Sequence, residues 1–217
     1  METLRPPKQR RSQETLTRFL DATRSLLQEK HFDNISVSEI AERAGSSVGA
    51  FYSRFADKEA LLMCLRDEFI RDVERETRDI VQSRNWDALP LEAVVQEFVR
   101  TVVRQHRRHR GTLRALVGRT IAGAGAGCPS AELEAPPSTR LLGHLIGRRS
   151  EIGHPDPDVA VHLGLAMVAG AIRERVLFPE LSASARPAAP VTDAVLVEEL
   201  SRALVAFLGV NTPERSE

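Results

Sequence analysis

Residues 36–62, "SVSEIAERAGSSVGAFYSRFADKEALL", determine how the rest of the chain is interpreted. Ser36 is followed three positions later by Glu39, which is the pattern of a capping box at the start of a helix. Gly45 stands where a left-handed residue would end that helix, and Ser47 can cap another helix only two residues later. The stretch therefore predicts helix, tight turn and helix, which is the layout of a helix-turn-helix.

The second of these helices, predicted for Val48 to Phe55, has one face with almost no side chains. When successive residues are placed 100° apart around the helix axis, Phe51 and Phe55 fall on the inward face, with Val48 nearby. The opposite face carries small side chains and one aromatic hydroxyl at its edge: Gly49, Ala50, Ser53 and Tyr52. Small residues allow a helix to enter the major groove of DNA deeply, where serine and alanine can contact base edges. This helix is therefore predicted to face bases.

Hydroxyls and cations around the two helices predict contacts with the phosphate backbone. Lys58 lies in the first turn of the next helix, where a cation opposes the helix dipole unless an anion is close. The hydroxyls of Ser36 and Ser47, with the free N–H groups at those helix starts, are further candidates. Arg11 and its neighbour Arg10 precede the first helix and are predicted to contact the backbone or the minor groove.

Residues 12–62 resemble the DNA-binding head of the tetracycline-repressor (TetR) family of transcriptional regulators. The stretch quoted above is close to that family's pattern of a Thr/Ser cap, I-A-x-x-A-G-[VS]-S, G-x-[FL]-Y-x-x-F and x-x-K-E-x-L. Carried over residue by residue, the resemblance implies DNA contacts from Ser36, Ser38, Ser47, Val48, Gly49, Ala50, Tyr52, Ser53 and Lys58. Ser46 stands where valine is common in the family, which implies a slightly looser turn.

The composition gives no general sign of nucleic-acid binding. The chain has 217 residues and a formal net charge of zero, so a polyanion must be bound by a local patch. The N-terminus lacks the apolar core of a signal peptide, and no run approaches the roughly 18 apolar residues of a membrane span. The two cysteines, Cys64 and Cys128, form neither a metal-spaced cluster nor a C-x-x-C pair. We therefore expect a cytoplasmic protein with reduced thiols, no cofactor and no membrane contact.

Apolar spacing of three and four along the chain predicts an all-α fold. The first helix is expected to begin at Ser12, and a long helix capped by Asp57 to fade near Asn85. Further helices are predicted over Leu91–Arg110, Leu113–Ala122, Thr139–Ile152, Asp158–Phe178 and Asp193–Leu208. The expected order is a basic tail, a helix-turn-helix head, a connecting helix, a ligand-binding and dimerisation body, and a second tail: residues 1–11, 12–56, 57–84, 85–209 and 210–217.

The body contains a helix that is apolar on nearly all sides, "VAVHLGLAMVAGAI". Such a helix must be buried all round, which fits packing on its own chain and on a partner subunit. Plain core within one chain is the alternative. The predicted dimer interface draws on this helix and the last one: Ala166, Gly170, Ile172, Leu200, Leu204 and Phe207. A homodimer would place two recognition helices in successive major grooves of a palindromic operator, about 34–36 Å apart.

The resemblance also implies a pocket for a small-molecule effector that releases the protein from DNA, with repression as the expected sign of regulation. Candidate lining residues lie on inward helical faces: Phe69, Trp86, Phe98, Val102, Leu116, His162 and Met167. Core packing without a ligand is the alternative for each of them. The polarity of the cavity, and with it the class of effector, is left open.

Other classes of function are less well supported. The chain shows no Ser/His/Asp arrangement in a recognisable turn, so no catalytic site is predicted. His106 and His109 lie three apart on one helical face, but no carboxylate or cysteine neighbours them to complete a metal site. Cations stabilising a helix C-terminus are the simpler account of that segment. A protein–protein adaptor whose head no longer binds DNA stays open, and it would show no salt-dependent operator affinity.

Overall fold

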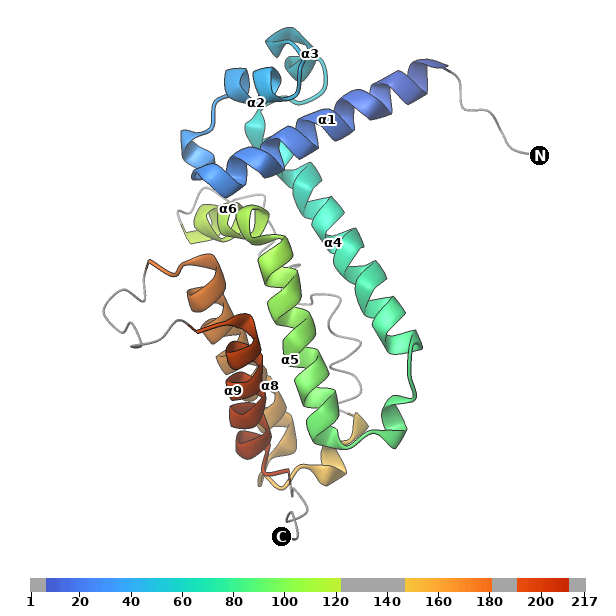
Figure 1. The fold of residues 1–217 in the computed structure, drawn as a ribbon, viewed down its shortest axis with the longest axis vertical. Helices are drawn as coiled ribbons and strands as arrows, with labels where there is room; N and C mark the ends of the chain where they lie inside the picture. Colours follow the sequence, from blue (N-terminus) through green and yellow to red (C-terminus); the bar gives the residue numbers. More distant parts are fainter. Residues whose placement is uncertain (1–6, 122–146, 181–190, 211–217) are drawn as a thin grey trace, which may run out of the picture. The chain divides into compact units, whose positions relative to one another are not determined.

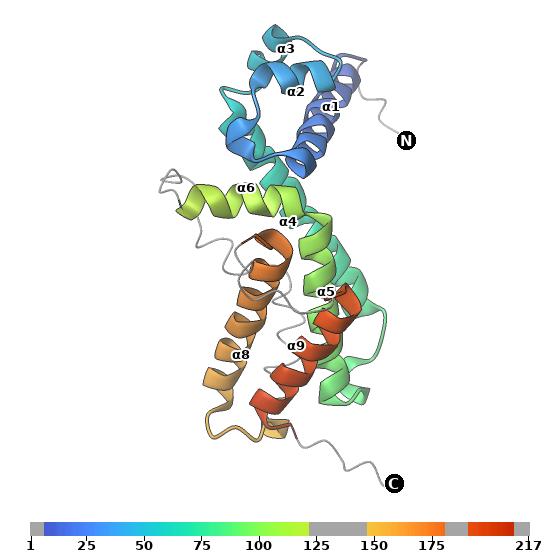
Figure 2. The same ribbon diagram turned by 60° about the vertical axis from the view of Figure 1, so that its left-hand side comes forward.

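The computed structural model describes residues 7–121, 147–180 and 191–210, and only the backbone of residues 7–11, 120 and 121. This part of the chain is largely helical (Figure 1, Figure 2). The helices are α1 (Pro7–Glu29), η1 (Phe32–Asn34), α2 (Val37–Arg43), α3 (Val48–Tyr52), α4 (Lys58–Gln82), η2 (Trp86–Ala88), α5 (Leu91–Arg108), α6 (Arg110–Ile121), η3 (Arg149–Glu151), α8 (Pro157–Ile172), η4 (Arg173–Leu177) and α9 (Asp193–Leu208). Extended pairing in these residues is limited to a bridge between Ile152 and Val210. The predicted all-α fold is confirmed.

The chain forms two compact units. The head unit comprises Met1–Phe69 with Gly111–Cys128, and the body unit comprises Ile70–Arg110 with Pro129–Glu217. Helix α4 therefore begins in the head unit and ends in the body unit. Helix α6 belongs to the head unit although it follows α5 in the sequence. The predicted boundaries differ from this division in the place of α6, which the sequence pattern assigned to the body.

Local hydrogen bonds define both ends of α2. Ser36 Oγ accepts the N–H of Glu39 at 3.2 Å, and Glu39 Oε2 accepts the N–H of Ser36 at 2.8 Å, so the predicted capping box is present. Gly45 has a φ of 58°, the left-handed conformation that glycine adopts without steric cost. Its amide donates to the carbonyl of Glu42 at 3.0 Å as the chain leaves the helix. These local predictions are confirmed.

Two more side chains begin the helices that follow. Ser47 Oγ accepts the N–H of Ala50 at 3.1 Å and caps α3. Asp57 Oδ1 accepts the N–H of Ala60 at 2.7 Å at the start of α4. Each bond satisfies a backbone donor that has no partner within its own helix. Both predicted caps are confirmed.

Three phenylalanines form the centre of the head unit. The ring centroids of Phe19 and Phe51 lie 5.6 Å apart, and that of Phe55 lies 6.0 Å from Phe19 and 5.1 Å from Phe51. All three side chains are buried, as predicted for Phe51 and Phe55. Aromatic contacts of this kind add about 0.5–1.5 kcal/mol to the effect of burying the rings. The cluster holds α3 against α1 from the inside.

Two helix boundaries in the head differ from the predictions. Helix α1 begins at Pro7 rather than Ser12, because a proline suits the first turn of a helix and lets it extend into the predicted tail. Helix α3 ends at Tyr52 rather than Phe55, because the following residues form a turn whose amides bond to the carbonyl of Phe51. Helix α3 is therefore shorter than its sequence pattern indicated.

Helix α6 packs against α1 in the head unit. A Cβ placed on Gly111 would lie 2.8 Å from Leu27 Cβ and 2.9 Å from its carbonyl oxygen, so the two helices approach closely there. Ala115 and Leu116 are buried in the same core cluster as the phenylalanines. The prediction that Leu116 lines an effector pocket in the body is wrong, because its side chain completes the core of the head.

In the body unit, α9 packs against both α5 and α8. A Cβ on Gly164 would lie 2.5 Å from Leu204 Cδ1, so this glycine allows α8 to lie close to α9. The N–H of Gly153 donates to the carbonyl of Gly209 at 3.2 Å and ties the segment before α8 to the end of α9. Helix α9 has its predicted bounds. Helix α8 ends at Ile172, where the chain widens into the π-helical turn η4.

Some predictions fall outside the described residues. They concern most of the helix predicted over residues 139–152, and Cys128; the side chains of Arg10 and Arg11 lie outside the description as well. In the parts that are described, no helix combines the length and the hydrophobicity needed to cross a bilayer. Nor do three or more His, Cys, Asp or Glu side chains come together there as a metal site would require.

Candidate nucleic-acid interface

Helix α3 and its ends present an open surface. The exposed residues are Ser47, Val48, Gly49, Tyr52 and Ser53, with Ala50 half-buried beside them. Val48 is 39% exposed, so the expectation that it packs behind the helix is wrong, although its predicted place on the DNA-facing side fits this exposure. Tyr52 is 56% exposed. A Cβ on Gly49 would have Ser47 Oγ as its nearest neighbour at 3.9 Å, so none of the residues described requires a glycine there for space.

The hydroxyl groups near this surface differ in whether their proton is free. Ser36 Oγ donates to Glu39 Oε2 at 2.9 Å, and Ser53 Oγ donates to the carbonyl of Ala50 at 2.8 Å. Ser47 Oγ acts as the acceptor in its cap, which leaves its proton available. Because a phosphate oxygen only accepts hydrogen bonds, the geometry favours Ser47 over Ser36 and Ser53 as a phosphate ligand. Ser38, also predicted to reach DNA, is exposed in the first turn of α2.

Lys58 holds together the loop that precedes α2. Its Nζ donates to the carbonyl oxygens of Phe32 at 3.2 Å, Asp33 at 3.3 Å and Ile35 at 3.2 Å. It also lies 4.8 Å from the centroid of the Phe32 ring. An ammonium group has three protons, and these three carbonyls occupy all of them. The predicted phosphate contact of Lys58 stays a prediction, while the geometry gives the residue a structural role that requires no DNA.

Two arginines that the sequence analysis did not select lie beside the same surface. Arg54 lies two residues after the end of α3, and its side chain has no ion-pair or hydrogen-bond partner among the described residues. Arg18 Nη1 donates to the carbonyl of Gly45 at 3.4 Å and Nη2 to Thr15 Oγ1 at 3.2 Å, which links α1 to the tight turn. The position of Arg54, a cation within one turn of α3, could have identified it from the sequence as a candidate DNA contact. The helical pattern did not identify it, because that pattern considers only which residues share a face of the helix.

The capping box of α2 is also an electrostatic cluster. Lys30 Nζ donates to Glu39 Oε1 at 2.5 Å. This hydrogen bond, together with those from the backbone and hydroxyl of Ser36, lowers the pKa of Glu39 from 4.5 to about 2, because all of them stabilise the charged carboxylate. Glu39 is therefore ionised at neutral pH and keeps the start of α2 in place.

The residues predicted to line an effector pocket do not gather in one place. His162 and Met167 are exposed on α8, so neither faces an interior; the uniformly apolar sequence of that helix gave no sign of which side faces out. Phe69 is buried in the head unit, as is Leu116. The predicted residues that are buried in the body unit are Trp86, Phe98 and Val102.

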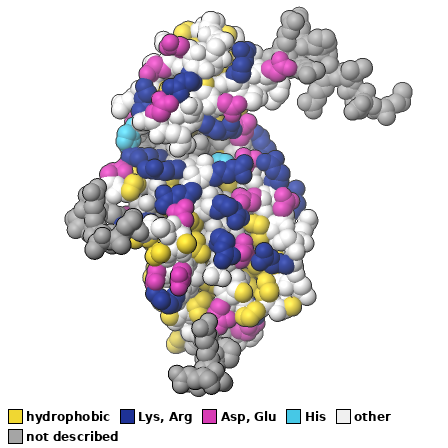
Figure 3. All heavy atoms as spheres, viewed as in Figure 1, with side chains coloured by type: hydrophobic (Ala, Val, Ile, Leu, Met, Phe, Trp, Pro, Cys, Tyr) yellow, Lys and Arg dark blue, Asp and Glu magenta, His cyan; other side chains and the backbone are white. Residues whose placement is uncertain are grey.

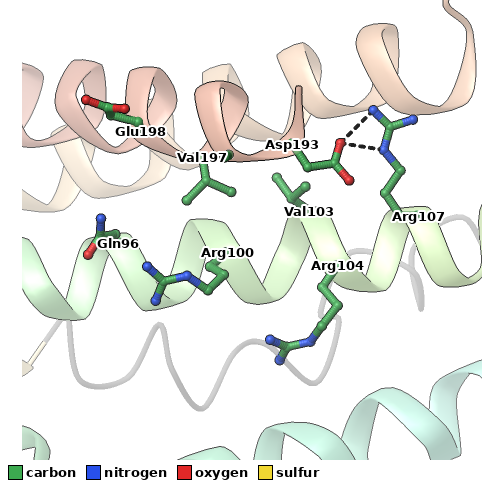
Figure 4. A pocket seen from close by; sticks show the side chains of 9 residues that line it. Gln96, Arg100, Val103, Arg104, Arg107, Asp193, Val197 and Glu198 are labelled. Atoms are coloured by element: carbon green, nitrogen blue, oxygen red, sulfur yellow. Dashed lines mark hydrogen bonds and ion pairs between the residues drawn. The ribbon is translucent and has the colours of Figure 1, made fainter. Parts of the chain in front are cut away.

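A groove of about 570 Å³ lies between α5 and α9 in the body unit (Figure 4). Three arginines of α5 contribute to its lining, but positive and negative side chains alternate over this surface (Figure 3). Each arginine is paired with an acidic side chain: Arg100 with Glu97, Arg104 with Glu76 and Arg107 with Asp193. Exposed pairs of this kind are typical of a solvated face, so we assign no ligand to the groove.

Helix α8 carries an exposed apolar stripe on the surface of the body unit. Val159, Leu163 and Met167 are 53%, 51% and 47% exposed, and they recur at every fourth position. Ala166 and Gly170, predicted at the dimer interface, are exposed on the same side of the helix. A contiguous apolar surface of this kind usually marks an interaction site.

Two residues predicted at the dimer interface lie inside the body unit instead. Ile172 and Leu204 are buried, and Leu204 packs beneath Gly164 of its own chain. They cannot contact a partner without opening the unit, so these two predictions are wrong. Leu200 and Phe207 are half-buried and stay predictions.

Comparisons with known proteins agree with the geometry of the head. Residues 19–63 match the family described as "Bacterial regulatory proteins, tetR family". The A-factor receptor protein of Streptomyces griseus is 30% identical over 125 residues, which cover 56% of this chain and 40% of that protein. The match thus spans less than half the length of that relative.

Solved structures share the fold of both units. A Mesorhizobium loti protein described as a TetR-family transcriptional regulator is 20% identical, with a TM-score of 0.60, and the match covers 95% of this chain and 98% of the other. A TetR transcription regulator from Haloarcula marismortui is 14% identical, with a TM-score of 0.65 and coverage of 91% and 97%. At these identities the likeness shows the fold alone.

The family match falls on the residues that build the head. It includes the phenylalanine cluster, the capping box of α2, the glycine turn and the exposed surface of α3. Helix-turn-helix heads of this kind bind DNA through the second helix of the motif. Residues 19–63 therefore match the tetR family of bacterial regulatory proteins, and their helices have the layout of a helix-turn-helix.

Proposed function

We propose that this protein is a homodimeric repressor that binds a palindromic operator and is released by a small-molecule effector. The observation that carries the proposal is the nearly bare surface of α3, which a buried aromatic cluster holds from behind. No packing among the described residues explains the small residue at Gly49, since a Cβ would fit there. Close approach to the major groove does explain it.

The proposed docking divides the contacts by chemistry. Gly49 and Ala50 lie against base edges, whereas Ser47, Tyr52 and Arg54 contact phosphates. Arg54 extends the predicted set because its charge has no partner among the described residues. Phosphate contacts make affinity fall with rising salt. Removing the Arg54 charge should weaken binding to all sequences alike and reduce the salt slope by about one unit.

The exposed stripe of α8 supports dimerisation. We propose that a second copy covers Leu163, Met167 and Gly170, since a soluble monomer rarely exposes such a stripe. No atom of the described residues lies within 4 Å of a Cβ placed on Gly170, which suits close approach by another helix. Met167→Glu would bury a charge in that interface and should raise the dimer dissociation constant more than about a hundredfold.

Sedimentation of the purified full chain measures this effect on dimerisation. Gln96→Glu adds the same charge at an exposed position of α5 and is the matched control, which should leave the dimer intact. Equal dissociation constants for Met167→Glu and the unaltered protein would contradict the assignment of this surface.

We propose that helix α6 couples effector binding to the DNA-binding surface, because it follows α5 closely in the chain. Arg119 forms an ion pair with Glu59 at the start of α4, approaches Asp33 at 3.5 Å and lies 5.2 Å from the Phe32 ring. Phe32 and Asp33 belong to the loop whose carbonyls accept hydrogen bonds from Lys58, and Glu59 follows Lys58 at the start of α4. Because α6 follows α5 after a single residue, we propose that an effector favouring one position of α5 shifts this cluster.

Selection from random double-stranded DNA tests the proposed function and requires no known operator. The full-length protein should enrich an inverted repeat with half-site centres about one helical turn or a multiple apart. The enriched sequence should bind less tightly as salt rises. Failure to enrich any sequence, with binding insensitive to salt, would contradict the proposal and favour an adaptor function.

A further inference from the structure

Uncharged polar groups on α4 and α5 of the body unit lie buried without a hydrogen-bond partner among the described residues. They are Thr77 Oγ1 on α4, and Thr101 Oγ1 and Gln105 Nε2 on α5. Both threonines are completely buried, and Gln105 is only 4% exposed. A buried polar atom without a partner destabilises the folded state, so native proteins contain few and each needs an explanation.

Two other buried hydroxyls among the described residues are satisfied by their own helix. Thr23 Oγ1 donates to the carbonyl four residues earlier at 2.8 Å, and Ser201 Oγ does the same at 2.6 Å. This back-bonding is a common arrangement for serine and threonine within helices. Thr77 and Thr101 do not use it, so their hydroxyls are available to another molecule in the interior.

Two ion pairs fix the register of α4 and its extension against α5 in the body unit. Arg104 Nε lies 2.6 Å from Glu76 Oε1, and Arg84 Nη1 lies 3.6 Å from Glu97 Oε2. The paired positions are eight residues apart on the first segment and seven on α5, so the two segments run antiparallel and in step. The second half of α4 can be followed beside α5 in Figure 1.

In this alignment, the three unpartnered groups lie at a similar height along the axes of the two helices. Thr77 directly follows the paired glutamate of α4, so it lies within about one helical turn of both Thr101 and Gln105 along the axis. Thr101 and Gln105 are themselves one turn apart on the same face of α5. That face also carries two buried apolar side chains, Phe98 and Val102.

We infer that Thr77, Thr101 and Gln105 bind the polar group of an uncharged, mainly apolar effector that carries a carbonyl oxygen. The inference rests on the proposed effector-responsive function and specifies the chemistry of the effector. Hydroxyl and amide N–H groups donate to a carbonyl, and the apolar neighbours contact the rest of the molecule. Glu76 and Arg104 neutralise each other beside the site, so their charges do not favour an ionic ligand.

The first arm of the test measures thermal stability in the absence of any added ligand. Thr77→Val and Thr101→Val replace an unpartnered hydroxyl by a methyl of similar shape, so each should raise the melting temperature by about 2–4 °C. Thr23→Val is the matched control, because its hydroxyl is already bonded, and it should lower the melting temperature. If Thr101→Val lowers it as well, a partner such as ordered water satisfies the hydroxyl and the inference is overturned.

The second arm measures binding of two probes of nearly equal shape, acetophenone and ethylbenzene, by calorimetry. The unaltered protein should bind acetophenone about tenfold more tightly, since its carbonyl accepts hydrogen bonds that ethylbenzene cannot. In a protein with both Thr101→Val and Gln105→Met this preference should fall below about twofold. Thr23→Val should retain it. A preference that is absent from the unaltered protein, or that persists in the double variant, overturns the inference.

Fluorescence anisotropy with the selected operator separates this inference from the proposed function. Selective probe binding that depends on Thr101 and Gln105 but leaves operator affinity unchanged would support the site and contradict its role in release. Operator release by both probes with equal potency in every variant would support an effector-responsive regulator and overturn the carbonyl assignment.

Discussion

The head unit and the body unit differ in whether the polar groups compared below have hydrogen-bond partners. In the head, Thr23 bonds to its own helix, and the amides at the helix starts are capped by Ser36, Ser47 and Asp57. In the body, Thr101 and Gln105 are buried with donors that no described residue satisfies. Satisfied helix starts suit a rigid surface for docking on DNA, whereas buried hydroxyl and amide groups without partners suit a region that binds another molecule. The same comparison separates interactions that local sequence determines from those that depend on tertiary packing.

The largest expected effect comes from the aromatic centre of the head. Phe51→Ala would remove a fully buried ring that touches both Phe19 and Phe55, and should cost about 3–5 kcal/mol of unfolding free energy. Chemical denaturation followed by circular dichroism measures it. If the head is held mainly by its aromatic cluster, Phe51→Leu, which retains most of the apolar volume, should recover at least half of that loss. A cost below about 1 kcal/mol for Phe51→Ala would show that the head does not depend on this cluster.

A pair of glycines on α6 tests whether this helix belongs to the head. A Cβ on Gly111 would lie too close to Leu27, so Gly111→Ala should destabilise the head by about 1–3 kcal/mol. A Cβ on Gly118 would meet no atom of the described residues within 4 Å, so Gly118→Ala should instead stabilise α6 by about 0.5–1 kcal/mol. Thermal unfolding of both variants measures the difference. Equal effects of the two substitutions would show that α6 does not depend on its contact with α1.

Much of the head was predictable because its signals are local. The capping box of Ser36 and Glu39, the turn at Gly45 and the inward Phe51 and Phe55 each depend on residues a few positions apart. The clamp formed by Lys58 was not predictable in this way, because its acceptors are carbonyls of a loop more than twenty residues earlier. A helical pattern shows that a cation begins α4 but not which backbone oxygens surround it.

The body was harder to predict because an apolar face does not identify its partner. Leu116 and Val102 have similar inward patterns, yet one completes the head core and the other lies in the body unit. Ile172 and Leu204 resembled interface residues but pack within the chain, while Met167 lies outside. Assigning such residues needs the three-dimensional arrangement of helices, which periodicity alone does not contain.

The capping box gives a smaller effect that depends on pH. Ser36→Ala should cost about 1 kcal/mol by removing the cap of α2. Because the pKa of Glu39 falls from 4.5 to about 2 on folding, its contribution is fully present above pH 4.5 and is lost as the pH falls toward 2.

Melting curves of the unaltered protein and Glu39→Gln at several pH values measure this linkage. The stability difference between the two should be constant near neutral pH and shrink between pH 4.5 and 2. A difference that is the same at neutral pH and at pH 2 would mean that the hydrogen bonds from Lys30 and Ser36 do not stabilise the charged carboxylate.

The central claim is that DNA lies directly against the bare surface of α3, and Gly49→Ala tests it most directly. The added methyl meets no atom of the described residues closer than 3.9 Å, so the melting temperature should be unchanged or higher. Anisotropy titration with the selected operator should nevertheless show affinity reduced by about tenfold, because the methyl intrudes on a closely packed interface, while Gly118→Ala should bind normally. Operator affinity within about twofold of the unaltered protein for Gly49→Ala would contradict the account.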